Sequence, residues 1–112
     1  MVIEVIRYAI RPGDEAALED AFRKAAVLLE ASSHCLGFTL TRATRDRHRY
    51  MMIIYWDSPD GHLIGFRQST AFREYQELLQ PYAEMIEESG HYRKTGVEMT
   101  KKALVRISGP PR

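Results

Sequence analysis

The feature that most constrains the fold is an unbroken run of apolar and aromatic residues, YMMIIYW, at positions 50–56. In a β-strand, alternate side chains point to opposite faces of the sheet. One face of this strand would carry Met52, Ile54 and Trp56, and the other would carry Met51, Ile53 and Tyr55. Helices can cover only one of these faces. We therefore expect a second copy of the same sheet to cover the other face, which gives a two-fold dimer.

Periodic apolar residues predict a first amphipathic helix. Asp14, a residue type that caps helices, follows a turn at residues 11–13, and Glu15 suits the first helical turn. The apolar stripe repeats at spacings of four, three and four: Leu18, Phe22, Ala25 and Leu29. This pattern predicts a helix that ends near Ala31.

A second helical region follows the apolar strand in two pieces. Ser58 and Pro59 favour the start of a short helix that reaches about residue 66. Ser69 or Thr70 can cap a longer one, whose apolar stripe is Phe72, Tyr75, Leu79 and Tyr82. Pro81 should end or kink that helix, because proline has no N–H and disfavours a helical conformation at the preceding residue.

Two further strands are predicted by apolar residues, at positions 2–10 and, with period two, at 36–40. The short segment 90–95, which contains His91 and Tyr92, is expected to be the last strand. The basic segment 42–49 reads as an exposed hairpin whose charges oppose edge-to-edge aggregation. The order β-α-β-β-α-β is typical of the ferredoxin-like fold, an α+β architecture with both helices on one face of an antiparallel sheet. We expect one domain over residues 1–95 and a tail over 96–112, in which residues 103–108 are a candidate extra strand.

Charge and composition exclude several classes of partner. The 16 basic and 15 acidic residues give a net charge of +1, which offers no general attraction to nucleic acid or to a membrane surface. No apolar run approaches the ~20 residues that a membrane span needs. Cys35 is the single cysteine, so an internal disulfide is impossible, which fits a reducing compartment. We expect a cytoplasmic protein.

Several segments together resemble the antibiotic biosynthesis monooxygenase family of the dimeric α+β barrel superfamily. They are the first strand with its acidic helix, CLGFTLTR, RYMMIIYWDSPDGH, GFRQSTAFREYQELLQPY and the pair His91-Tyr92. The resemblance covers residues 2–95. It implies a homodimer with sheets packed face to face and a small-molecule pocket between sheet and helices in each subunit. Similar members oxidise quinols or polyketide phenols with dioxygen, without metal or flavin, so no cofactor is expected. Others degrade haem or isomerise small signalling molecules.

The haem-degrading branch of the family is disfavoured at two positions. Its members carry an asparagine in the first strand, where Ile6 stands in this chain. They carry a haem-ligating histidine in the second helical region, where Gln76 stands, and glutamine is a poor ligand for haem iron.

Cofactor-free oxidation needs a base to deprotonate an electron-rich phenol, donors to hold the anion, and a water-poor cavity. His62 is the candidate catalytic base, since it begins a helix just beyond the buried strand. The alternative is a histidine that faces solvent at a helix start. The candidate substrate-binding residues are Trp56, Phe66, Arg67, Phe72, Tyr75 and Tyr82. Plain core packing, or for Arg67 a salt bridge, is the alternative.

No metal site is predicted. Histidines 34, 48, 62 and 91 form no i, i+4 pair, and no carboxylate stands beside them at ligand spacing. A metal site would need distant residues to be brought together by the fold. His34 and Cys35 are adjacent on a strand and point to opposite faces, which argues against a Cys/His nucleophile.

The function expected is a cofactor-independent monooxygenase that acts on a quinol-like or polycyclic phenolic small molecule. Two alternatives stay open at this point. One is an isomerase or lyase of a small carbonyl metabolite, which would use the same base without oxygen. The other is a non-catalytic protein that binds a small ligand in the same pocket.

Overall fold

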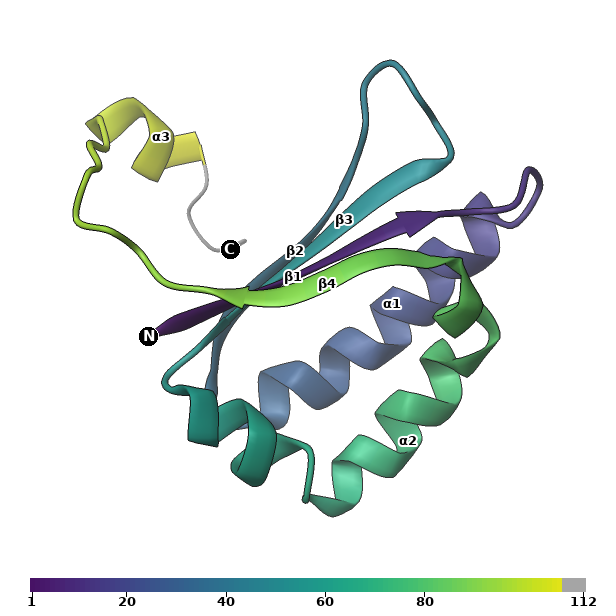
Figure 1. Cartoon of the computed structure of the whole chain (residues 1–112), viewed down its shortest axis with the longest axis horizontal. Helices are drawn as coiled ribbons and strands as arrows, with labels where there is room; N and C mark the ends of the chain where they lie inside the picture. The colour runs from purple at the N-terminus through teal and green to yellow at the C-terminus, as the bar shows by residue number, and fades with distance from the viewer. Residues whose placement is uncertain (108–112) are drawn as a thin grey trace.

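A computed structural model describes residues 1–107 as one antiparallel sheet with helices α1 and α2 on the same face (Figure 1). The strands are β1 (Val2–Ala9), β2 (Cys35–Arg42), β3 (Arg49–Trp56) and β4 (Ile86–Tyr92). The α-helices are α1 (Glu15–Ala31), α2 (Thr70–Leu79) and α3 (Lys102–Ile107), and a π-helix (Gly61–Phe66) and a 3-10 helix (Gln80–Met85) flank α2. The strand order β2-β3-β1-β4 confirms the ferredoxin-like α+β fold.

The core lies between the sheet and the two helices. The inward face of β3 is almost completely buried: Met52 is 1% exposed, and Ile54 and Trp56 are 0% exposed. The predicted stripe of α1 packs onto this face, and all four of its residues are buried. The periodicity of α1 therefore correctly predicted its internal side, whereas the run of apolar residues on β3 left open which of its two faces is internal.

The opposite face of β3 stays partly exposed. Met51, Ile53 and Tyr55 are of intermediate exposure, and they lie beside Ile3 and Val5 of β1 on the same face of the sheet. This face is continuous and largely apolar at its centre. The two-fold dimer that would cover it stays a prediction.

Glycines allow the π-helix to pack closely against the start of β2. Ser58 Oγ accepts a hydrogen bond from the Gly61 N–H at 2.9 Å, as expected of a residue at a helix start. The His34 ring, which is hydrogen-bonded to Asp57 at 3.0 Å, lies against the backbone of Gly61 and Gly65. A Cβ atom would overlap Asp57 at position 61 and His34 at position 65. This close approach positions the π-helix over the end of β3.

Proline ends α2 where expected, but two predicted caps differ. The helix stops at Leu79, and the chain continues as a 3-10 helix through Pro81. Neither Asp14 nor Ser69 makes a side-chain capping bond. The Asp14 carboxylate instead lies 3.6 Å from the Arg11 guanidinium. The Ser69 hydroxyl donates to the Phe66 carbonyl at 2.6 Å.

The last part of the chain corrects two predictions. The final strand is Ile86–Tyr92 rather than residues 90–95, because pairing with β1 begins opposite Tyr8 and includes polar residues that carry no strand signal. The candidate strand at 103–108 is wrong for residues 103–107, which are helical in α3; this segment contains alanine, leucine and arginine, which are good helix formers. Ser108 lies outside the described residues. Helix α3 lies on the side of the sheet away from α1 and α2 (Figure 1).

Within residues 1–107, none of the helices is long and apolar enough to cross a membrane.

Candidate active site

A cavity of about 310 Å³ lies between the sheet and α2. Its walls come from β1, β3, the π-helix, α2 and the start of β4. The size falls within the range of small-molecule pockets. Aromatic and aliphatic side chains make most of the wall. The polar groups are contributed by Glu4, Tyr8, His62, Arg67, Tyr75, Gln76, Gln80 and Ser89.

The cavity brings together most of the residues predicted for the site. His62, Trp56, Phe66, Arg67, Phe72 and Tyr75 all line it. Tyr82 is buried but is not among the residues that line it. Ile6 and Gln76, the positions that argued against haem degradation, are also part of the wall.

An aromatic cluster forms the end of the cavity at the close of β3. The Trp56 and His62 rings are stacked, with centroids 4.6 Å apart and an interplanar angle of 11°. Phe66 packs against Trp56 at 5.2 Å and edge-on against Tyr75 at 5.1 Å. Arg67 is exposed and lies 5.6 Å from the centroid of the Phe72 ring. The cluster fixes the imidazole of His62, which is only 7% exposed.

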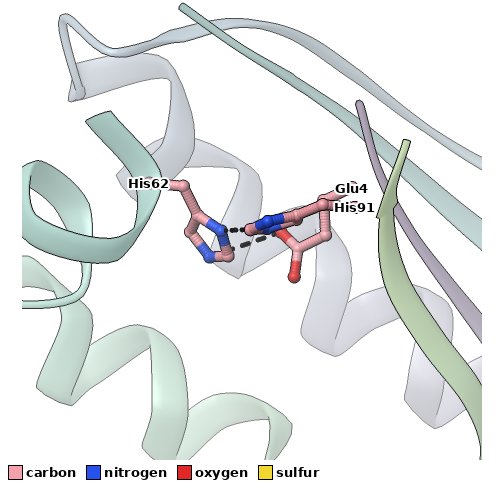
Figure 2. Close-up of side chains that lie close together, drawn as sticks. All are labelled: Glu4, His62 and His91. Atoms are coloured by element: carbon pink, nitrogen blue, oxygen red, sulfur yellow. Dashed lines mark hydrogen bonds and ion pairs between the residues drawn. The ribbon is translucent and has the colours of Figure 1, made fainter. Parts of the chain in front are cut away.

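Three side chains from separate elements meet beside this cluster (Figure 2). His62 Nδ1 and His91 Nε2 are 2.8 Å apart, so one imidazole donates a hydrogen bond to the other. His62 Nε2 lies 3.5 Å from Glu4 Oε1, and the Trp56 indole N–H donates to the same oxygen at 3.0 Å. His91 is exposed, whereas His62 is buried. The arrangement therefore connects the cavity wall to solvent through two imidazoles.

Burial shifts the pKa values of His62 and Glu4 in opposite directions. Desolvation lowers the pKa of His62 to about 4, and the positive fields of His91 and Arg67 add to this shift. The imidazole is therefore neutral at neutral pH. Desolvation raises the pKa of the Glu4 carboxyl above its usual value, against the opposing hydrogen bond from Trp56 and the fields of His91 and Arg67. A neutral base thus lies beside a poorly solvated carboxyl group.

Glu4 and His91 were missed by the sequence reasoning. Glu4 alternates with the buried residues Val2 and Ile6, so the strand pattern alone placed a carboxylate on the inward face. This alternation could have predicted Glu4 as a residue of the site. His91 lies directly opposite Glu4 across the β1–β4 pair. Its place could not be predicted without the register of β4.

The other two histidines lie outside the cavity. His34 bonds Asp57 beside the π-helix, and His48 Nδ1 lies 3.2 Å from Glu15 Oε2 near the start of α1. Neither is among the residues that line the cavity.

The antibiotic biosynthesis monooxygenase family model matches residues 1–78. The chain belongs to this family. The matched region contains Glu4, Trp56 and His62 but ends before His91. An uncharacterized protein of Bacillus subtilis (strain 168), YczJ, is 30% identical over 82 residues, which are 73% of this chain and 86% of that protein.

Two solved structures share the fold. A candidate antibiotic biosynthesis monooxygenase of Bordetella bronchiseptica is 29% identical, with a TM-score of 0.69, over 83% of this chain and 95% of that one. SnoaB of Streptomyces nogalater, a cofactor-independent oxygenase, is 22% identical, with a TM-score of 0.67, over 87% of this chain and 97% of that one. At this identity, SnoaB supports the fold alone.

Proposed function

We propose that this protein is a cofactor-independent monooxygenase that oxidises a quinol-like or polycyclic phenolic small molecule with dioxygen. The observation that carries the proposal is a buried His62 in the wall of a largely aromatic cavity. Membership of the family supports it. The oxygenase activity stated for SnoaB, which has the same fold, is consistent with it.

His62 would act as the base that activates the substrate. When its Nδ1–H donates to His91, the Nε2 lone pair is free beside Glu4 to accept a phenolic proton. The imidazolium that forms lies 3.5 Å from the Glu4 carboxylate, which would stabilise it. His91 then offers the proton a path to solvent, because its side chain is exposed.

The phenolate is the form that reacts with dioxygen, since removing the proton makes the ring a better electron donor. Insertion of one oxygen atom at a ring C–H converts phenol and O₂ to a quinone and water, so the substrate itself supplies all the electrons. The aromatic part of the wall would limit the access of water to this reaction. Arg67, at the cavity wall, can offer a positive charge to the anion.

The test is oxygen uptake, with ¹⁸O₂ incorporation into product, over a panel of mono- and polycyclic phenols. His62→Ala should lower the rate by about 10²-fold or more, the usual contribution of a positioned base. His48→Ala is the matched control, because His48 also contacts a glutamate but lies outside the cavity. Its rate should equal that of the unmodified protein.

Equal rates for His62→Ala and His48→Ala would remove His62 from the mechanism. Turnover that is unchanged under argon would replace the oxygenase by the isomerase or lyase alternative. A tightly held small molecule that is recovered unaltered after long incubation would favour the binding protein.

A further inference from the structure

We infer that Glu4, His62 and His91 form a binding site for a divalent transition-metal ion, with Zn²⁺ the expected occupant. This inference goes beyond the proposed function and does not depend on it. The three residues lie far apart in the sequence, so ligand spacing could not reveal them. The fold collects them from β1, the π-helix and β4.

The ligand atoms are already close enough to share one ion. One atom from each residue can be chosen so that all three lie within 4.8 Å of one another (Figure 2). Zn²⁺ binds imidazole nitrogen and carboxylate oxygen at about 2.0–2.2 Å, which places neighbouring ligands of a tetrahedral site about 3.3–3.5 Å apart. The 2.8 Å contact between the two imidazoles would open slightly, and Glu4 would move a small distance toward them.

Charge is the second reason to expect a cation here. Glu4 carries a carboxylate that is only 15% exposed. Within residues 1–107, its one ion-pair contact within 4 Å is with His62, and no lysine or arginine pairs with it. A poorly solvated carboxylate is costly without a positive partner. A divalent ion between Glu4 and the two imidazoles would supply that positive charge.

The surroundings suit a metal ligand set. The Trp56 N–H donates to Glu4 Oε1 and orients the carboxylate, as outer-shell donors do in metal sites. The stacked Trp56 ring holds His62 in place. Glu4 and His62 both line the cavity, so a fourth coordination position would face the space where a small molecule binds.

The donor types select the class of ion. Two imidazoles and one carboxylate suit Zn²⁺, Co²⁺ and Ni²⁺, whereas Mg²⁺ and Ca²⁺ prefer all-oxygen sites. Three protein ligands with an open position are typical of zinc sites that exchange ligands. An ion held by His62 Nδ1, the atom that lies 2.8 Å from His91, would leave the ring proton on Nε2, the atom that the proposed base needs free. Bound Zn²⁺ should therefore inhibit the monooxygenase reaction.

The experiment is titration of the chelator-treated full-length protein with Co²⁺, followed by the visible d–d absorption of the ion, and with Zn²⁺ by calorimetry. The expected result is one site per chain with a tetrahedral Co²⁺ spectrum. Glu4→Gln and His91→Ala should each weaken Zn²⁺ binding by about 100-fold or more, since even outer-shell changes cost 10–100-fold. His91 is exposed, so its replacement should leave the fold intact, as circular dichroism would verify.

The matched controls are His48→Ala and Glu15→Gln, which alter a histidine–glutamate contact outside the cavity and should bind Zn²⁺ as tightly as the unmodified protein. A Zn²⁺ affinity that is the same in Glu4→Gln, His91→Ala and these controls would overturn the proposal. So would the absence of tetrahedral Co²⁺ absorption.

The metal-site proposal and the monooxygenase proposal can fail independently, and an oxygen-uptake assay distinguishes the two cases. Failure of metal binding would leave the monooxygenase proposal unchanged, since binding is measured without substrate. Conversely, oxygen uptake by the chelator-treated protein could require added Fe²⁺. The oxidation that Fe²⁺ causes without protein would be subtracted. Such a requirement for Fe²⁺ would support the metal site, because two histidines and one carboxylate also hold iron in oxygenases, and would overturn cofactor independence.

Discussion

Two histidine–glutamate contacts in this protein are similar in distance, but the pKa of the glutamate is raised in one and lowered in the other. His62 lies 3.5 Å from Glu4 in the cavity wall, and His48 lies 3.2 Å from Glu15 outside the cavity, near the start of α1. Burial raises the pKa of Glu4, whereas backbone hydrogen bonds and His48 lower the pKa of Glu15. The two glutamate side chains are similarly exposed, 15% for Glu4 and 16% for Glu15, but their partners differ. Glu15 accepts a hydrogen bond from the Gly13 N–H at 2.8 Å, and its histidine side chain is 39% exposed, whereas that of His62 is 9% exposed. Backbone donors and the burial of the histidine, rather than proximity, therefore distinguish the two contacts.

The largest expected difference between the two contacts is in turnover. Glu4→Gln should lower the rate of phenol oxidation by about 10²-fold, because the neutral amide cannot stabilise the imidazolium that forms on His62. Glu15→Gln should leave the rate unchanged. Oxygen uptake at saturating phenol measures both. Similar rates for the two variants would contradict the role given to Glu4.

Hydrogen-bond donors to buried and exposed carboxylates should also differ in their effect on stability. Trp56→Phe removes the donor to buried Glu4, and we expect a loss of about 2 kcal/mol in the free energy of unfolding. Tyr50→Phe removes the hydroxyl that donates to the more exposed Glu19 at 2.7 Å, with an expected loss of about 1 kcal/mol. Urea denaturation measures both losses. A greater loss for Tyr50→Phe would reverse the comparison.

The third histidine–carboxylate contact, between His34 and Asp57, packs against the π-helix and should also contribute to stability. In Gly65→Ala the new methyl group overlaps His34, which must leave Asp57 and swing into solvent. We expect destabilisation by about 1–2 kcal/mol. Gly37→Ala is the control, because its Cβ would lie at an ordinary 3.8 Å from Tyr55. Thermal unfolding of the two variants should separate them, and equal melting temperatures would show that the close packing at position 65 is dispensable.

The finest test is titration of the two glutamates themselves. In chelator-treated protein with labelled carboxyl carbons, NMR should give Glu4 a pKa above its usual value of 4.5 and Glu15 a pKa below it. The sign for stability follows. The lowered pKa of Glu15 means that its stabilising contribution is present above pH 4.5 and is lost as the pH falls through the folded-state pKa. Identical midpoints would remove the electrostatic distinction.

The sequence predicted the parts of the fold that depend on local pattern. The period of α1 indicated its buried side, and Pro81 indicated the end of α2. The residues proposed for the site that do line the cavity all come from one segment, Trp56 through Tyr75. Glu4 and His91 are far apart in the sequence and come together through pairing between β1 and β4. No local sequence pattern shows which residues pair between strands so far apart. These contacts are therefore known only from the structure.

The π-helix that carries His62 has a consequence for how this active site can change. Each hydrogen bond of a π-helix spans five residues, whereas that of an α-helix spans four. The loss of a single residue between Gly61 and Phe66 would therefore convert the segment toward an α-helix and rotate its side chains, without a change in the strands. Chain length at this one connection can therefore change where the imidazole of His62 points relative to the cavity.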